Sequence, residues 1–167
     1  MTWRFLMNAG PKTPEQAGGI VKALQEGAIE IIVAGHWSIE AFEAAHPSKE
    51  TEAWLEKHRP AGPLDLACPV EDRERVEAAL AALDFARRDE FDGSFRFEDR
   101  RGCIVNLTCF RRARDGGRIY PKLGLRGEDW YYPPECVVQG RLGSVPVKTE
   151  GPDGIDRARA AEAFDEA

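Results

Sequence analysis

The stretch IIVAGHWSIEAF, residues 31–42, places polar side chains where an apolar strand meets a helix. A glycine at such a junction, here Gly35, often lets backbone N–H groups approach a phosphate. His36 follows at once, and an imidazole can donate a hydrogen bond to an anion or act as an acid or base near neutral pH. Three interpretations are open: a phosphate-binding loop, a loop of that kind changed to a new use, or an ordinary turn in which His36 is a polar residue packed beside Trp37.

The pattern of apolar and polar residues predicts the elements that must position these groups. Thr13 is expected to cap the first helix with Pro14 in its first position, and Ser38 to cap the second helix. The predicted order is helix 13–27, strand 28–34, helices 38–45 and 48–58, strand 63–69, helix 70–85, strands 94–99 and 102–110, two short strands within 136–149, and an acidic helix 154–167. This order predicts an α/β (α+β) fold, a small mixed β-sheet flanked by helices, as a single domain over residues 1–167.

Composition limits the class of protein. The chain has 167 residues, of which 43% are hydrophobic and 31% charged, as is normal for a soluble globular protein. The net charge of -6 argues against a nucleic-acid or anionic-membrane partner, since both need a basic surface. No apolar run approaches the roughly 20 residues of a membrane span. The N-terminus also lacks a signal-peptide pattern, so we expect a cytoplasmic protein.

The four cysteines are expected to be small apolar residues. None forms a C-x-x-C pair, so a zinc site is not expected. Cys103 and Cys109 lie on one predicted strand, roughly 20 Å apart at the usual rise per residue. That distance is too long for a disulfide.

Three segments match, in order, the motifs of a known family. They are LQEGAIEIIVAGHWSIEAF, then HRPAGPLDLACPVEDRERVEAALAALDF, then DRRGCIVNLTCF followed by DWYYPPECVVQGRLGSVPVKTEGP. They resemble the GGWAVDAL, D-L-D-L, VDLHPV and W-Y-P…G-x-L-G-G motifs of the aminoglycoside and lincosamide nucleotidyltransferases, in the DNA polymerase β-like superfamily. The resemblance covers nearly the whole chain, and the helix 48–58 accounts for a longer link between Trp37 and Asp65. It implies a nucleotidyltransferase fold, in which three carboxylates hold magnesium ions that align a nucleoside triphosphate with a drug hydroxyl.

This sequence departs from the family at those carboxylates. The D-x-D motif falls on Pro63-Leu64-Asp65, the third aspartate on Asn106, and the second glycine of GGW on His36. Magnesium favours charged oxygen ligands in octahedral geometry, so a single carboxylate is a poor site for two ions. We therefore expect no metal here. The resemblance makes His36 and Asp65 the candidate acid and base, with Asn106 as a polar orienting group.

Other positions that match family motifs are candidate ligand contacts. Glu40 lies where the family often has an acidic residue, although a solvated helix residue is the simpler interpretation. His58 and Arg59 fall near the triphosphate-facing TR-x-H motif, but they could equally form a charged helix end. Trp130 and Tyr131 match the aromatic segment and could line a ligand cleft or cover the sheet. The full candidate set for ligand binding is Gly35, Trp37, Ser38, Glu40, His58, Arg59, Thr108, Trp130 and Tyr131.

Three functions compete. The first is a nucleotidyltransferase-fold protein that has lost metal-dependent transfer and reuses its cleft, for small-molecule binding or metal-free acid/base chemistry, in natural-product biosynthesis or self-resistance. It needs no cofactor. The second is an active nucleotidyltransferase that modifies hydroxyls of an aminoglycoside- or lincosamide-like drug. It needs Mg²⁺, a nucleoside triphosphate and carboxylates recruited from Glu40, Glu98 or Asp99. The third is a non-catalytic interaction subunit, which could form a homodimer through its last helix.

Overall fold

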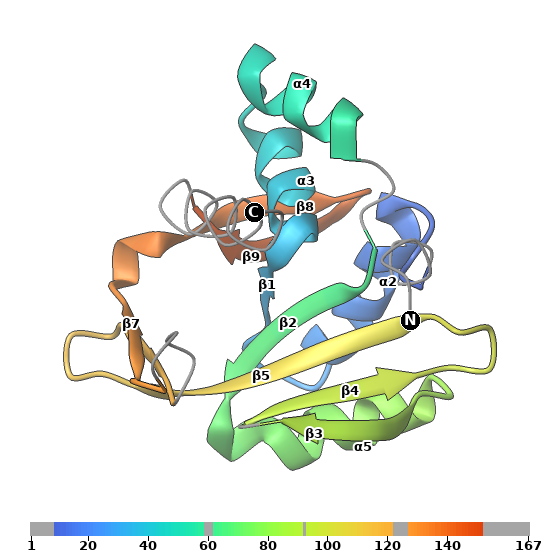
Figure 1. The fold of residues 1–167 in the computed structure, drawn as a ribbon, viewed down its shortest axis with the longest axis vertical. Helices are drawn as coiled ribbons and strands as arrows, with labels where there is room; N and C mark the ends of the chain where they lie inside the picture. The colour runs from blue at the N-terminus through green and yellow to red at the C-terminus, as the bar shows by residue number, and fades with distance from the viewer. Residues whose placement is uncertain (1–8, 59–61, 92, 122–126, 152–167) are drawn as a thin grey trace.

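The computed structural model describes residues 9–58, 62–91, 93–121 and 127–151, and it is a mixed β-sheet with helices packed against it (Figure 1). This confirms the predicted α/β (α+β) class. The acidic helix predicted at 154–167 lies outside the described residues. Among the residues that are described, no helix is both long and apolar enough to span a bilayer.

The helices and strands have the following bounds. The helices are α2 (Pro14–Gln25), α3 (Gly35–Ala45), α4 (Lys49–His58) and α5 (Arg73–Ala82), with short 3-10 turns η1 (Val70–Asp72) and η2 (Pro134–Cys136). The strands are β1 (Ile32–Ala34), β2 (Leu64–Pro69), β3 (Ala86–Phe91), β4 (Ser94–Glu98), β5 (Ile104–Arg112), β6 (Arg118–Tyr120), β7 (Trp130–Tyr132), β8 (Val137–Leu142) and β9 (Val145–Glu150). In Figure 1, α5 lies beside β3 at one end of the molecule, and α3 lies against β8 and β9 at the other.

The sheet brings polar residues from distant parts of the chain to its centre. Its strand order is β3-β4-β5-β2-β1-β9-β8, and β6 pairs with β5 and β7. β2 runs parallel to β5, and β1 runs parallel to β9. In this register, Asp65 lies beside Asn106 on one side and beside Ala34 on the other. The end of β1, immediately before Gly35, therefore lies beside Asp65, and Asn106 lies one strand further along the sheet.

Two apolar cores lie on opposite faces of the central strands. Val33 and Leu66 belong to the larger core, together with residues of α2, α3 and α5. Ile32 and Ala67 belong to a second core, which contains aromatic residues of β6 and β7. Because successive side chains of a strand alternate between faces, Asp65 shares the face of Ala67. Asp65 therefore lies on the face where β6 and β7 pack.

Most of the predicted elements are confirmed, although β1 begins at Ile32 rather than at residue 28, and α5 covers Arg73–Ala82 rather than 70–85. Thr13 Oγ1 accepts a hydrogen bond from the backbone N–H of Gln16 at 3.2 Å, so Thr13 caps α2 as expected. β4 and β5, both predicted as strands, pair with each other in an antiparallel arrangement. β8 and β9 pair around a turn in which Gly143 has a φ of +62°. The four cysteines are free thiols.

The start of α3 corrects one expectation. We expected a turn after Gly35 and a helix capped by Ser38. The helix instead begins at Gly35 itself, and Ser38 already lies in its first turn, where Oγ donates a hydrogen bond to the Gly35 carbonyl at 2.6 Å. Gly35 has a φ of +62°, so the chain passes from strand to helix at a single residue and no separate turn is needed.

The sequence pattern does not predict β3, β6 or β7. β3 has the sequence ARRDEF and lies at the edge of the sheet. Edge strands often carry charged side chains, which removes the alternation that identifies a strand. β6 and β7 are only three residues long, and they lie in a region rich in glycine, proline and aromatic residues. Such short strands depend on their neighbours for pairing.

Gly18 and Gly19 are neighbours in α2 and test its packing as a matched pair. A Cβ on Gly18 would lie 2.3 Å from the carbonyl oxygen of Leu142, whereas one on Gly19 would meet nothing within 4 Å. We expect Gly18→Ala to lower the free energy of unfolding by about 1–3 kcal/mol through overpacking. Gly19→Ala should raise it by about 0.5–1 kcal/mol, because alanine favours a helix. Urea unfolding measures both, and equal effects would contradict the close approach of α2 to β8.

Candidate functional site

The candidate site is built around the junction between β1 and α3. Gly35 adopts a φ of +62°, and a Cβ at this position would lie 2.3 Å from Asp65 Oδ2. Only glycine satisfies both conditions. The Asp65 carboxylate therefore lies directly against the first residue of α3.

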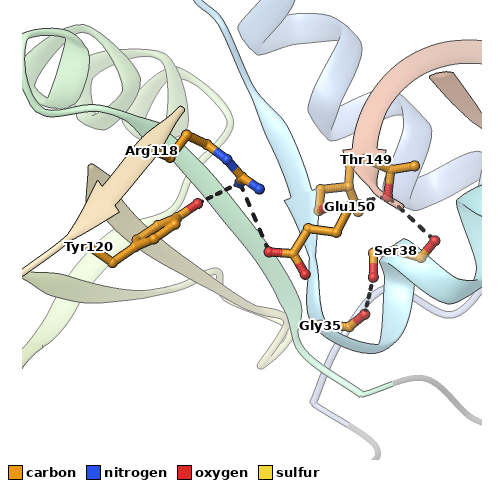
Figure 2. A network of polar contacts seen from close by, with 7 residues as sticks. Gly35, Ser38, Arg118, Tyr120, Thr149 and Glu150 are labelled. Atoms are coloured by element: carbon orange, nitrogen blue, oxygen red, sulfur yellow. Dashed lines mark hydrogen bonds and ion pairs between the residues drawn. The ribbon is translucent and has the colours of Figure 1, made fainter. Parts of the chain in front are cut away.

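Hydrogen bonds from β9 hold this junction in place. Thr149 Oγ1 is placed to donate to the carbonyl oxygens of Val33, at 3.2 Å, and Ser38, at 3.4 Å. Figure 2 shows Thr149 beside Ser38, with Ser38 pointing back to Gly35. Thr149 and Ser38 are fully buried. The start of α3 is thus anchored to the strand that lies beside β1.

Asp65 belongs to a chain of three side chains on adjacent strands. Asn106 Nδ2 donates a hydrogen bond to Asp65 Oδ1 at 2.9 Å, and Arg96 Nε donates to Asn106 Oδ1 at 3.3 Å. Arginine is only a donor, so its contact fixes the orientation of the Asn106 amide and leaves the NH₂ group facing Asp65. Asn106 therefore lies beside Asp65 with its NH₂ group directed at the carboxylate, and its role as an orienting group stays a prediction.

Burial raises the pKa of the Asp65 carboxyl to about 6. The hydrogen bond from Asn106 and the positive charge of Arg96 act in the opposite direction, but the loss of solvation is larger. A carboxyl group with this pKa holds and releases its proton close to neutral pH. Such a group can serve as a general acid or base.

A cavity of about 90 Å³ opens beside Asp65. Its walls combine apolar strand residues with polar side chains and are formed by Ala34, Asp65, Leu66, Ala67, Thr108, Tyr120, Tyr132 and Glu150. The volume corresponds to about three water molecules. The cavity can therefore admit one functional group of a ligand, with the rest of the molecule outside. Thr108, predicted as a ligand contact, is among the lining residues.

Glu150, Arg118 and Tyr120 form a buried polar group that the sequence pattern did not indicate. Arg118 is 2% exposed and Glu150 is 7% exposed. Arg118 Nη1 donates a hydrogen bond to Tyr120 Oη at 2.6 Å and lies 3.9 Å from Glu150 Oε1, as Figure 2 shows. Since Glu150 also lines the cavity, a second carboxylate joins Asp65 there. Arg118 was one of many arginines in the sequence, and no local signal distinguished it.

His36 and Trp37 lie in different surroundings from Asp65. The His36 ring is 5.0 Å from the Trp54 ring of α4, and His36 does not line the described cavity. Trp37 is 3% exposed, and its Nε1 donates a hydrogen bond to the Gly62 carbonyl at 3.0 Å. The tertiary structure thus places the His36 ring against α4 and the Trp37 side chain in the core. Their roles as catalytic and ligand-binding residues stay predictions.

The other candidate ligand contacts lie at several places. Glu40 lies on α3 and is partly buried. Trp130 packs against Tyr132 at 6.2 Å, and the exposed Tyr131 donates a hydrogen bond to Asp115. His58 ends α4 but its side chain is not among the described ones, and Arg59 lies outside the described residues.

The carboxylates considered as replacement metal ligands have other partners. Asp99 Oδ1 accepts hydrogen bonds from the backbone N–H groups of Arg101 and Cys103, both at 2.9 Å. Glu98 forms an ion pair with Arg88 at 3.9 Å. These contacts hold the β4–β5 turn and the β3–β4 edge. Within the described residues, no group of three histidine, cysteine, aspartate or glutamate residues could hold a metal ion.

Comparison with known proteins shows similarity at the level of structure. No protein-family model matches the chain, and no curated protein matches its sequence. The lincosamide antibiotic adenylyltransferase LnuA, with lincomycin bound, matches with a TM-score of 0.64 at 8% identity, over 86% of this chain and 84% of that one. ANT(2'')-Ia in complex with adenylyl-2''-tobramycin matches with a TM-score of 0.60 at 19% identity, over 89% and 74%. The solution structure of this antibiotic-resistance factor matches with a TM-score of 0.58 at 20% identity, over 81% and 63%.

These similarities define the class of fold. The chain has the fold of the lincosamide and aminoglycoside nucleotidyltransferases, which confirms the architecture that the sequence resemblance implied. The identities of 8% to 20% establish the fold and leave the reaction to be argued from the site.

The raised pKa of Asp65 makes stability depend on pH. The native carboxyl keeps its proton up to a pH of about 6, whereas the model value for an unperturbed carboxyl is 3.8. Ionisation therefore penalises the folded state above pH 6, and the penalty disappears as the pH falls toward 4. We expect Asp65→Asn to unfold with a free energy about 1–3 kcal/mol higher than wild type at pH 7.5, and with a much smaller difference at pH 4.5.

Urea unfolding at both pH values measures this difference. Asp89→Asn is the matched control, because Asp89 is exposed on the edge strand β3. Its effect should be equal at the two pH values. An Asp65→Asn effect that is also equal at both would contradict a raised pKa in the folded protein.

Proposed function

We propose that this chain binds a small, hydroxyl-bearing, antibiotic-like molecule over the Asp65 cavity and acts on it through metal-free acid/base chemistry. The observation that carries the proposal is the hydrogen bond from Asn106 Nδ2 to Asp65 Oδ1. A second carboxylate would be needed at position 106 for the family's magnesium chemistry. A neutral amide donor occupies it instead.

The charges around Asp65 do not fit a pair of magnesium ions. Asn106 Oδ1, the one oxygen that this residue could offer to a metal, accepts a hydrogen bond from the Arg96 guanidinium. A cation would therefore meet a fixed positive charge, and the second carboxylate of the cavity, Glu150, already forms an ion pair with Arg118. Magnesium needs several charged oxygens to replace its water ligands. No reaction step through a metal is assigned to these residues.

Asp65 is the group best suited to move a proton in this cavity. In its ionised form it can accept a proton from a ligand hydroxyl that enters the cavity, and in its protonated form it can return one. Its pKa of about 6 leaves both forms accessible near neutral pH. Asn106 would keep the carboxylate oriented. The role of His36 as partner acid or base stays a prediction, as does a homodimer.

Nucleotidyl transfer to an antibiotic hydroxyl is the second candidate. The structural similarity to LnuA and ANT(2'')-Ia favours this function over a loss of transfer, because the matched structures contain lincomycin and adenylyl-2''-tobramycin. The transfer would need Mg²⁺, a nucleoside triphosphate and at least one further carboxylate. Glu150 lines the same cavity as Asp65 and is the available one.

Calorimetric titration separates the two candidates. We expect lincomycin or tobramycin to bind without magnesium, and Asp65→Asn to weaken that binding about tenfold through loss of a charge-assisted hydrogen bond. Asp89→Asn should leave it unchanged. Magnesium with each nucleoside triphosphate should produce no binding heat and no nucleotidylated antibiotic by mass spectrometry.

Magnesium-dependent formation of a nucleotidylated antibiotic would reject the first candidate and establish the second. Failure of both antibiotics to bind, together with no transfer, would reject a drug-binding cleft of either kind. Each binding or transfer result counts only for a sample that is shown to be folded.

Replacing the amide by a carboxylate tests why the metal site does not fit. Asn106→Asp would place two carboxylates side by side, because positions 65 and 106 are paired across β2 and β5. We expect Mn²⁺, which binds magnesium sites, to bind the variant at least tenfold more tightly than wild type. We also expect the unfolding free energy at pH 7.5 to fall by about 1–3 kcal/mol through like-charge repulsion. Unchanged Mn²⁺ affinity, measured by calorimetry, would contradict the role given to Asn106.

A further inference from the structure

A second cavity, of about 270 Å³, lies on the sheet face that carries Asp65. Ile32 lines this cavity, and Ala34, two residues further along β1, lines the Asp65 cavity. Alternate residues of a strand share a face, so the two cavities open on the same side. The larger volume is sufficient for a small anion and its water molecules.

Arg118 lines this cavity, and two of its hydrogen-bond donors have no acceptor among the described residues. The side chain is 2% exposed. Its Nη1 donates a hydrogen bond to Tyr120 and forms an ion pair with Glu150. Nε and Nη2 are buried and make no hydrogen bond within the described part of the chain. These two N–H groups lie on one edge of the guanidinium plane. That edge matches two oxygens of a single carboxylate or phosphate group.

Aromatic rings fix the plane of this guanidinium. The carbon Cζ of Arg118 lies 5.1 Å from the ring centre of Tyr132, 5.5 Å from that of Tyr120 and 5.9 Å from that of Phe110. Contacts of this kind stabilise a buried cation. They also hold it in one orientation, so little conformational entropy would be lost when an anion binds along the free edge.

Positive charge also surrounds the opening. Arg112 and Lys148 line the cavity, and both form ion pairs with Glu30. The described lining residues include three cationic side chains and one carboxylate. The net positive charge would attract an anion, in contrast to the net charge of -6 of the chain as a whole.

We propose that this cavity is a binding site for a small oxyanion, a phosphate or carboxylate group, held side-on by Arg118 with Arg112 and Lys148 at the rim. The site goes beyond the function proposed for Asp65 and rests on different residues. The two cavities adjoin at the Arg118–Glu150 ion pair, because Arg118 lines one and Glu150 lines the other. A ligand with an anionic group could therefore reach both.

The test is a titration of the full chain with inorganic phosphate at constant ionic strength, followed by calorimetry. We expect saturable binding at one site. Arg112→Gln and Lys148→Gln should each weaken it about three- to tenfold through loss of a cation at the rim. Arg111→Gln is the matched control, because Arg111 immediately precedes Arg112 in β5 and is similarly exposed. It is paired with Asp129 at 3.7 Å and lies outside the cavity lining.

Arg118→Lys keeps the buried charge but removes the parallel pair of donors, so we expect it to abolish saturable binding while the unfolding transition is retained. If that variant does not fold, the comparison of Arg112→Gln with Arg111→Gln decides. A parallel titration with acetate identifies the anion: saturation by phosphate, by acetate or by both supports the site and names its class. The proposal is overturned if neither anion saturates, or if Arg111→Gln weakens binding as much as Arg112→Gln.

Discussion

The close approach of Asp65 to Gly35 is the constraint on which the rest of the site depends. The left-handed backbone at Gly35 turns β1 into α3 within one residue, and the absence of a Cβ leaves room for the Asp65 carboxylate. Buried hydrogen bonds from Thr149 and Ser38 hold this junction against β9. The carboxylate is consequently shielded from solvent, and burial is the largest cause of its raised pKa.

Asn106 places a neutral amide beside Asp65, so the charges here differ from those of a site with two adjacent carboxylates. Two adjacent carboxylates repel each other unless cations lie between them, whereas an amide and a carboxylate attract each other directly. Asn106 extends this attraction to Arg96, so the polar groups are paired within the protein itself. The paired arrangement keeps Asp65 in a buried, hydrogen-bonded setting in which burial raises its pKa to about 6.

The face that carries Asp65 is more polar than a typical covered sheet face. Arg118 and Glu150 lie in its aromatic core, and their ion pair separates the two cavities. Burying such a pair costs solvation energy that a single contact at 3.9 Å does not fully recover. Groups of this kind often persist because they bind or act on something. Here the unsatisfied edge of the guanidinium points to an anion as that partner.

The sequence by itself determined the class of fold and most element positions, since periodicity, caps and turn residues act locally along the chain. It also placed Asp65 and Asn106 in matching motifs. Only the tertiary structure decided that Arg96 orients Asn106, that the His36 ring contacts Trp54, and that Arg118 meets Glu150. Alternation along a strand predicts which side chains share a face, but it does not predict which strands become neighbours. The Arg118–Glu150 contact joins β6 and β9 through pairing and packing that no local pattern records.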